Sequence, residues 1–262
     1  MGFVKSMEEL VLIGQMQTHF YDAEMLFLFW ETRPEVVERL LPPPLEPAGY
    51  PMAMAFVANY PRTSFGPPYK EGALFLNAQF EGVTGSFCLS MPVTDDLAMA
   101  AGRERFGYPK KMAAINFKRE GDQVSGSIER HGARFFEVQA AMDEQAVDEG
   151  FKALITQGFA FHDESGSSGY LFKHFLSPEG VGFDYPPRLI RQSNVFRPKL
   201  IEWGQAQVEL NPCEHDPWNE VEIVNMLPAM YIVSDNTMLG GKVVAEVDPI
   251  EFMPYAFQKW DW

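Results

Sequence analysis

Residues 102–113 read GRERFGYPKKMA, and they contain the most informative feature of the chain, the lysine pair Lys110–Lys111. Gly107-Tyr108-Pro109 stands directly before the pair, and proline cannot continue a helix and also restricts the residue before it. The segment is therefore expected to enter the lysines in an extended conformation. Because successive side chains of an extended segment point to opposite faces, Lys110 and Lys111 should meet different surroundings.

A lysine amine attacks a ketone only in its neutral form, and at an ordinary pKa of about 10.4 only roughly 0.04% of it is neutral at pH 7. Burial in an apolar pocket, or a neighbouring cation, disfavours the ammonium and enlarges the neutral fraction. By this chemistry alone, two adjacent lysines are typical of solvated surface charge. Since the two side chains should diverge, we expect burial to contribute more to activation than the neighbouring lysine does.

The same segment closely resembles the active-site segment of the acetoacetate decarboxylase family, in which Gly-Arg-Glu is followed within a few residues by Tyr/Phe-Pro-Lys-Lys. The resemblance implies that Lys110 is the nucleophile that forms a Schiff base with a keto acid, and that Lys111 is its neighbour. In that family the lysine is activated by desolvation or by an adjacent cation. The first step then gives an iminium that acts as an electron sink.

The resemblance extends from about Phe20 to Val247. Family members assemble as oligomers, so it also implies a homo-oligomer, a tetramer or larger. Besides residues 102–113, the segments that carry the resemblance are Val36–Glu46 ending LLPPPLE, Tyr69-Lys70-Glu71, Phe80–Gly85, Gly169–Lys173, Pro187–Leu189 and Val221–Val224.

The patterning predicts one α+β domain, residues 1–262, dominated by antiparallel β-sheet. Gly and Pro (21 and 20 residues) punctuate many short segments, which favours strands and turns over a βαβ series. The resemblance implies the β-barrel or cone of the family, with a few peripheral helices. The expected strands are Met25–Trp30, Met52–Ala58, Ala73–Phe80, Ser86–Met91, Ala113–Lys118, Val124–Glu129, Phe135–Ala141, Tyr170–Phe175, Leu200–Leu210, Met230–Val233 and Lys242–Val247.

Helices are expected where a capping residue or a proline precedes apolar periodicity. The sequence GSSG at Gly166–Gly169 is expected to form a flexible turn. The expected helices are one capped by Thr32, with Pro34 in its first turn and Pro42–Pro44 after it; one capped by Thr94 or the Asp95–Asp96 pair and ended by Gly107 and Pro109; Ala146–Gln157; and Pro249–Trp260, which Pro254 weakens.

Several side chains are candidates for contact with the substrate. Tyr108 should pack beside the lysines. Arg103 and Glu104 belong to the motif, and we interpret them as an ion pair that positions the loop at the substrate. Tyr255, or alternatively Tyr231, is a candidate proton donor, although tyrosines at such positions more often belong to the core or the surface.

Two positions depart from the pattern of the true decarboxylases of the family. Those enzymes carry an arginine where this chain has Ala23, although Arg33 and Arg62 lie nearby in the sequence, and a glutamate where it has the stretch Ala55–Ala58. Glu71 is then the remaining candidate for a general acid or base, since a buried carboxyl near an apolar lysine pocket suits proton transfer. Both departures change how a carboxylate substrate is held and how protons move.

The sequence therefore favours a cofactor-independent lyase for 2-oxo or 3-oxo acids that works through an iminium and enamine on Lys110. Pyruvate aldolase-dehydratase or 2-oxo-enoate hydratase chemistry is the favoured type, with a small keto acid and an aldehyde as substrates. True acetoacetate decarboxylation is the alternative. A second alternative is a non-catalytic protein whose pocket binds carbonyl ligands.

Composition argues against several other classes. With 36 acidic and 21 basic residues, the net charge of −15 opposes binding to nucleic acid, although a local pocket can still attract a small anion. Cys88 and Cys213 lack a CxxC spacing and are interpreted as reduced thiols. The histidines form neither HxH nor HExxH, so no metal site is expected. Neither GxGxxG after a strand nor GxSxG occurs.

The sequence also shows no targeting or membrane signal. Residues 1–24 contain no long apolar run and no small-residue cleavage site, so a signal peptide is not expected. Nowhere do about twenty apolar residues follow one another, as a membrane-spanning helix requires. We therefore expect a cytoplasmic protein.

Overall fold

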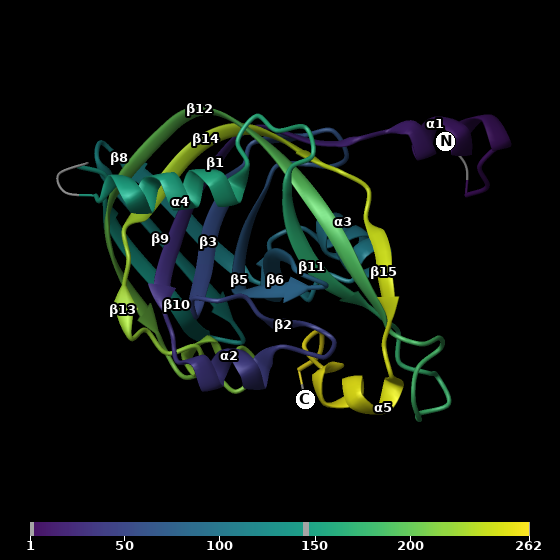
Figure 1. Ribbon diagram of the computed structural model, residues 1–262. Coiled ribbons are helices and arrows are strands. Elements are labelled where there is room, and N and C mark those ends of the chain that lie inside the picture. The colour runs from purple at the N-terminus through teal and green to yellow at the C-terminus, as the bar shows by residue number, and fades with distance from the viewer. Residues whose placement is uncertain (1–2, 144–146, 262) are drawn as a thin grey trace.

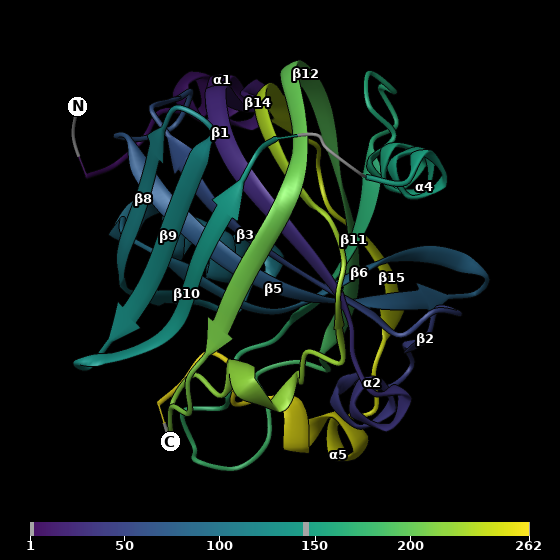
Figure 2. The same cartoon turned by 90° about the vertical axis from the view of Figure 1, so that its left-hand side faces the viewer.

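An extensive, mainly antiparallel β-sheet organises the computed structural model, which describes residues 3–143 and 147–261 (Figure 1). The strands are hydrogen-bonded in the order β11-β6-β5-β3-β1-β14-β12-β10-β9-β8. Because β11 also pairs with β12, the strands from β11 to β12 form a closed ring, and β10, β9 and β8 continue from β12 as an outer sheet (Figure 2). The predicted α+β class is confirmed.

The bounds of the elements differ from the predicted ranges mostly by extension of the strands. The strands are β1 Thr18–Glu31, β2 Glu46–Pro47, β3 Met52–Tyr60, β4 Arg62–Thr63, β5 Tyr69–Phe80, β6 Val83–Val93, β7 Lys110–Met112, β8 Ala114–Glu120, β9 Gln123–Arg130, β10 Ala133–Ala141, β11 Ser167–Lys173, β12 Arg188–Leu210, β13 Asn225–Met226, β14 Ala229–Met238 and β15 Lys242–Glu246. The α-helices are α1 Met7–Gln15, α2 Pro34–Leu40, α3 Asp96–Ala101, α4 Glu149–Phe159 and α5 Pro249–Phe252. No helix of the described residues has the length and apolar character needed to cross a membrane.

The central strand β1 is buried on both faces, which explains why its sequence is a continuous apolar run rather than an alternating one. Leu26, Leu28 and Trp30 point to a core shared with the outer sheet. Phe27 and Phe29, on the opposite face, belong to a second core on the inner side of the ring. The inner core continues into the cavity described below.

Two predictions about local structure are wrong at helix boundaries. Thr32 does not cap α2. The N-cap is Arg33, which makes no side-chain cap, and the buried Thr32 hydroxyl has no hydrogen-bond partner among the described residues. The predicted helix Pro249–Trp260 ends at Phe252 and passes into a 3₁₀ turn, because Pro254 cannot donate the next backbone hydrogen bond.

Further predictions are wrong in position. In the predicted turn Gly166–Gly169, residues 167–169 belong to β11, and the turn lies before Gly166. The predicted helix Ala146–Gln157 begins instead at Glu149, where the Asp148 side chain caps it, and residue 146 lies outside the described residues. Strand β12 begins at Arg188 rather than at the predicted Leu200, and its first half was missed since polar side chains interrupt it.

The helix predicted before the lysine pair is confirmed, and a π-helical turn follows it. The Asp95 side chain accepts a hydrogen bond from the Ala98 amide and caps α3, which continues as one π-helical turn over Gly102–Phe106. The turn ends at Gly107, whose φ is +94°. A Cβ at Gly107 would collide with the backbone of Phe172 on β11. Glycine is therefore required here both by the conformation and by the close approach of a strand.

We predict that Gly107→Ala destabilises the fold by about 3 kcal/mol, since it combines left-handed strain with overpacking against backbone. Gly82→Ala is the matched control: Gly82 also has a positive φ, +75°, but a Cβ added there would meet nothing within 4 Å. The control should lose only about 1 kcal/mol. Urea unfolding followed by circular dichroism measures both values, and equal losses would contradict the packing argument.

Candidate active site

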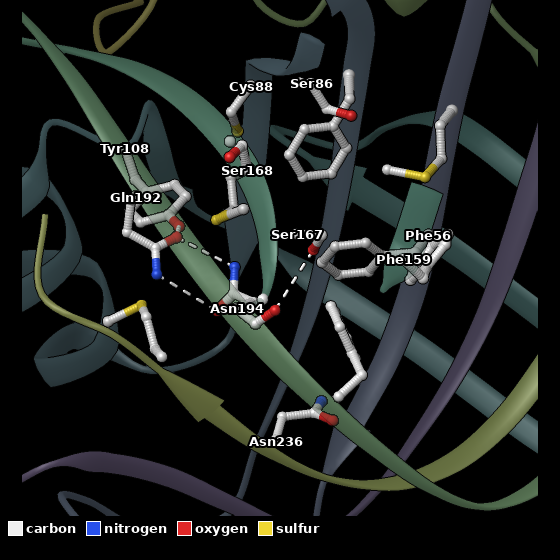
Figure 3. Close-up of a pocket in the computed structure, with 18 of the residues that line it drawn as sticks. Phe56, Ser86, Cys88, Tyr108, Phe159, Ser167, Ser168, Gln192, Asn194 and Asn236 are labelled. Atoms are coloured by element: carbon white, nitrogen blue, oxygen red, sulfur yellow. Dashed lines mark hydrogen bonds between the residues drawn. The ribbon is translucent and has the colours of Figure 1, made fainter. Parts of the chain in front are cut away.

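A cavity of about 790 Å³ lies on the inner side of the strand ring. Aromatic side chains from several elements line it, among them Phe27 from β1, Phe56 from β3 and Phe159 from α4. Figure 3 shows Phe56 and Phe159 close together on one side of this space, across from the polar side chains of β12. A large apolar cavity with a few polar groups is the usual form of a small-molecule site.

Lys110 and Glu71 meet in this cavity. Lys110 begins β7, which runs parallel to β6 with Lys110 opposite Met91, and Glu71 lies on β5 opposite Val93 of β6. Nζ of Lys110 donates a hydrogen bond to Oε2 of Glu71 over 2.6 Å, and the two side chains are only 8% and 7% exposed. The structure thus brings two of the predicted site residues together as a buried ion pair.

Gly102 makes room for the lysine side chain. A Cβ at this position would lie 2.8 Å from both Cδ and Cε of Lys110. The glycine of the GRE sequence, Gly102, therefore lets the alkyl chain of Lys110 pass directly over the helical segment and reach Glu71. This gives the glycine of the motif a physical role that spacing alone does not reveal.

Three buried tyrosines surround the ion pair. The Tyr69 hydroxyl lies 3.4 Å from Oε2 of Glu71, and the Tyr60 ring packs on Tyr69 with the centroids 5.0 Å apart. Nζ of Lys110 is 5.8 Å from the Tyr69 ring centroid and 5.6 Å from that of Tyr108. Burial, with the negative charge of Glu71 adding to it, raises the pKa of all three phenols above the usual range. They stay protonated at neutral pH and can donate hydrogen bonds.

A second polar group in the cavity comes from β12 and was missed by sequence reasoning. Tyr108 donates to Oε1 of Gln192 over 2.8 Å, and the Asn194 amide donates to the same oxygen over 3.0 Å (Figure 3). Asn236 of β14 also lines the cavity and accepts a hydrogen bond from Ser234 over 2.6 Å. The signal in the sequence was the spacing of two between Gln192 and Asn194, which places both on one face of a strand.

Lys111 points away from this cavity, as the extended segment predicted. Its Nζ donates to the His215 carbonyl over 2.7 Å and to Asp261 over 2.9 Å, and it lies 3.6 Å from Asp216. The Arg130 guanidinium shares both aspartates. Hydrogen bonds from Arg130 in particular hold the pKa of Asp261 far below its usual range. Lys111 is therefore a member of a separate ion cluster that ties the C-terminal segment to β7 and β9.

The other predicted contact residues do not line the cavity of Lys110. Arg103 and Glu104 line a second, smaller cavity and form no ion pair with each other, so their interpretation as a loop-positioning pair is wrong. Tyr231 belongs to the core shared with the outer sheet, and Tyr255 is partly buried against Phe252 in the C-terminal segment. Tyr108 alone among the predicted substrate-contacting residues reaches the cavity within the described part of the chain.

The arginines near the departures from the family pattern lie at the surface. Ala23 is fully buried in β1, Arg33 pairs with a surface glutamate at 2.6 Å, and Arg62 lies 3.7 Å from a surface aspartate. In the stretch Ala55–Ala58 the lining residue is a phenylalanine. Among the described residues that line the cavity, the arginine is Arg105, which is exposed and which sequence reasoning did not single out.

Comparison with known proteins shows relatives with a similar sequence and fold. The chain is 25% identical over 242 residues to acetoacetate decarboxylase 2 of Mesorhizobium japonicum. The matched region covers 88% of this chain and 84% of that protein. The structure of acetoacetate decarboxylase from Legionella pneumophila superposes with a TM-score of 0.77 at 21% identity, over 88% of each chain. The enduracididine biosynthesis enzyme MppR, in complex with the condensation product of pyruvate and imidazole 4-carboxaldehyde, gives a TM-score of 0.73 at 18% identity, over 89% of this chain and 91% of that one.

The family model for acetoacetate decarboxylase matches residues 8–247. The matched range contains every strand of the ring, the lysine pair and Glu71. This chain belongs to the acetoacetate decarboxylase family.

Proposed function

We propose that the protein is a Schiff-base lyase in which Lys110 forms an imine with a 2-oxo acid, and that the derived enamine condenses with an aldehyde. The observation that carries the proposal is the buried pair of Lys110 and Glu71, 2.6 Å apart, inside a large apolar cavity. Membership of the family supports lyase chemistry in general. The choice among reactions rests on the residues of the site.

Imine formation needs a neutral amine, and in the proposed reaction Glu71 produces it by taking a proton from Lys110. Transfer of a proton from the Lys110 ammonium to Glu71 leaves an amine and a carboxylic acid, which removes two charges from a buried place. The amine adds to the ketone carbon, and the carbon–oxygen bond then breaks as water leaves. The proton that Glu71 returns balances this loss, so the products are the iminium, one water and the Glu71 carboxylate.

The enamine step uses the same carboxylate as a base. Glu71 removes a proton from the carbon next to the iminium, and the C–H electron pair becomes the enamine double bond while nitrogen is neutralised. The enamine carbon then attacks the aldehyde carbon, and the proton held by Glu71 or by the neutral Tyr69 hydroxyl passes to the aldehyde oxygen. Loss of water and hydrolysis of the conjugated iminium release a 2-oxo-3-enoic acid and free Lys110.

The size of the cavity favours condensation over reaction of a small keto acid alone. At about 30 Å³ for each water, a cavity of 790 Å³ has the volume of about 26 water molecules. Pyruvate or acetoacetate fills a minor part of that space, so a second, apolar reactant can lie against Phe27, Phe56 and Phe159. MppR, which has a similar fold, binds such a condensation product of pyruvate with an aldehyde.

Decarboxylation of acetoacetate is the second candidate, and the relatives named acetoacetate decarboxylase favour it. A decarboxylase of the family pattern has an arginine and an extra glutamate in its site. In this chain Ala23 and the stretch Ala55–Ala58 stand at those positions, Glu71 is the carboxylate among the described lining residues, and Arg105 is exposed. These differences support condensation over loss of CO₂.

We predict that pyruvate with borohydride adds a stable mass to the protein and that peptide mapping places it on Lys110. Lys110→Ala should abolish trapping, and Lys110→Arg should do so too, because a guanidinium stays protonated and cannot attack. Lys111→Met is the matched control and should keep the adduct, since the Lys111 amine lies in a different cluster. Unmodified wild-type protein would favour a non-catalytic pocket and refute the lyase proposal.

We predict that Glu71→Gln slows the exchange of pyruvate methyl protons with deuterium about hundredfold or more, because the amide cannot accept the proton. Proton NMR of pyruvate in D₂O measures the exchange. Tyr255→Phe, a change outside the cavity, should leave the rate unaltered. If Glu71→Gln exchanged as fast as the wild type, another base would have to be sought.

We predict negligible CO₂ release from acetoacetate, together with condensation of pyruvate and an aromatic aldehyde to a product that absorbs in the near ultraviolet. Loss of a charged group from an active site commonly lowers the reaction rate a hundredfold or more, which corresponds to about 3 kcal/mol of transition-state stabilisation. The same enzyme batch should be assayed for CO₂ and for absorbance. Rapid CO₂ release without a condensation product would establish the decarboxylase alternative instead.

A further inference from the structure

A second cavity, of about 190 Å³, lies beside the helical segment that supports Lys110. Ala98, Gly102 and Phe106 of that segment line the large cavity, whereas Met99 and Arg103 line the small one. The two spaces are therefore on different faces of the same segment. The rest of the small cavity comes from the loop after β11 and the C-terminal segment; these residues include His174, Phe175, Leu176, Lys259 and Trp260.

Lys259 is buried in this cavity and has no partner among the residues that the structure describes. Lys259 is only 8% exposed, and among the described residues its side chain has neither a hydrogen bond nor an ion pair. Burial, followed by the positive charges of Arg103 and Lys173, lowers its pKa to about 7. A buried charge is costly unless a group of opposite sign accompanies it. An amine in this position is therefore suited to a ligand that supplies the negative charge.

Arg103 is the second cation of the cavity. Its guanidinium carbon lies 5.3 Å from the Trp260 ring centroid, and it forms no ion pair within the described residues. The chain has a net charge of −15, so carboxylates are abundant, yet none of the described ones pairs with Arg103 or Lys259. Glu104 also lines the cavity, and its charge partly opposes the lowering of the Arg103 pKa by burial, but Glu104 is exposed and forms no salt bridge with Arg103. His174 contributes no charge at neutral pH, because burial lowers its pKa to about 4.

We propose that this cavity binds a small monocarboxylate, with its carboxylate between Arg103 and Lys259 and its apolar body against Met99, Leu176 and Trp260. Arginine and lysine are the groups that proteins use for a carboxylate. The apolar side chains of the lining favour an organic anion over phosphate or chloride. The volume, about six waters at about 30 Å³ each, limits the ligand to a few carbon atoms.

Binding should depend on pH through Lys259. The carboxylate binds best when the amine is protonated, so affinity is full below about pH 7 and falls as the pH rises above it. The other charged groups near Lys259 are Arg103 and Lys173, whose positive charges act on it, and Glu104, which lines the same cavity. Lys259 is therefore the group whose titration controls the affinity near neutral pH.

The experiment is an NMR titration of the full-length protein with isobutyrate at pH 6 and pH 8. It uses the Lys110→Ala variant, so that the carboxylate cannot pair with the Lys110 amine in the large cavity. We expect saturable binding at pH 6 that is weaker at pH 8. Lys259→Met, added to this variant, should weaken binding about tenfold or more, because it removes a charge-assisted contact. Lys242→Met removes an exposed lysine elsewhere and should leave the affinity unchanged.

Folding of the variants is controlled separately. Lys259→Met should melt no lower than its parent, because it removes an uncompensated buried cation and keeps the length of the side chain. Equal affinity in Lys259→Met and its parent, or absence of saturable binding at pH 6, would overturn the proposal. Phosphate or chloride binding as tightly as isobutyrate would overturn the assignment to a carboxylate.

Discussion

The pairing of the short strand β7 with β6 is the constraint on which the active site depends. It holds Lys110 beside Met91, so that the side chain enters the ring and meets Glu71 from β5. The left-handed Gly107 brings the chain into this pairing, and Gly102 leaves the space through which the lysine passes. Without the pairing, the amine and the carboxylate would belong to unrelated surfaces.

Three buried lysines show how partners decide what an amine can do. Lys111 has two aspartates and a carbonyl oxygen around it, so it stabilises the fold by joining the C-terminal segment to β7. Lys110 has one carboxylate partner, close enough to exchange a proton, and a large apolar cavity in front of it. Lys259 has no partner among the described residues. The same side chain is thus a structural tie in Lys111, the proposed nucleophile in Lys110 and the proposed anion-binding group in Lys259.

Much of the fold and the centre of the site could be predicted from the sequence. The apolar run of β1 and the alternation in β12 reflect local burial, and the motif around Lys110 located the lysine and its divergence from Lys111. Which side of the helical turn Gly102–Phe106 each motif residue faces is set by tertiary packing, so Arg103, which was expected at the substrate, lies in the second cavity instead. Gln192 and Asn194 were missed because polar residues that face an inner cavity look like loop residues in a sequence.

Strand β12 has 23 residues and belongs to both layers of the molecule. Its first part, Arg188–Asn194, pairs with β11 and closes the ring, its middle pairs with β14, and Gln205–Leu210 pairs with β10 of the outer sheet. The segment that closes the ring and the segment that holds the outer sheet are therefore consecutive parts of one strand. Because one continuous strand joins the two layers, cleavage or insertion in the middle part of β12 should disturb the cavity and the attachment of the outer sheet together.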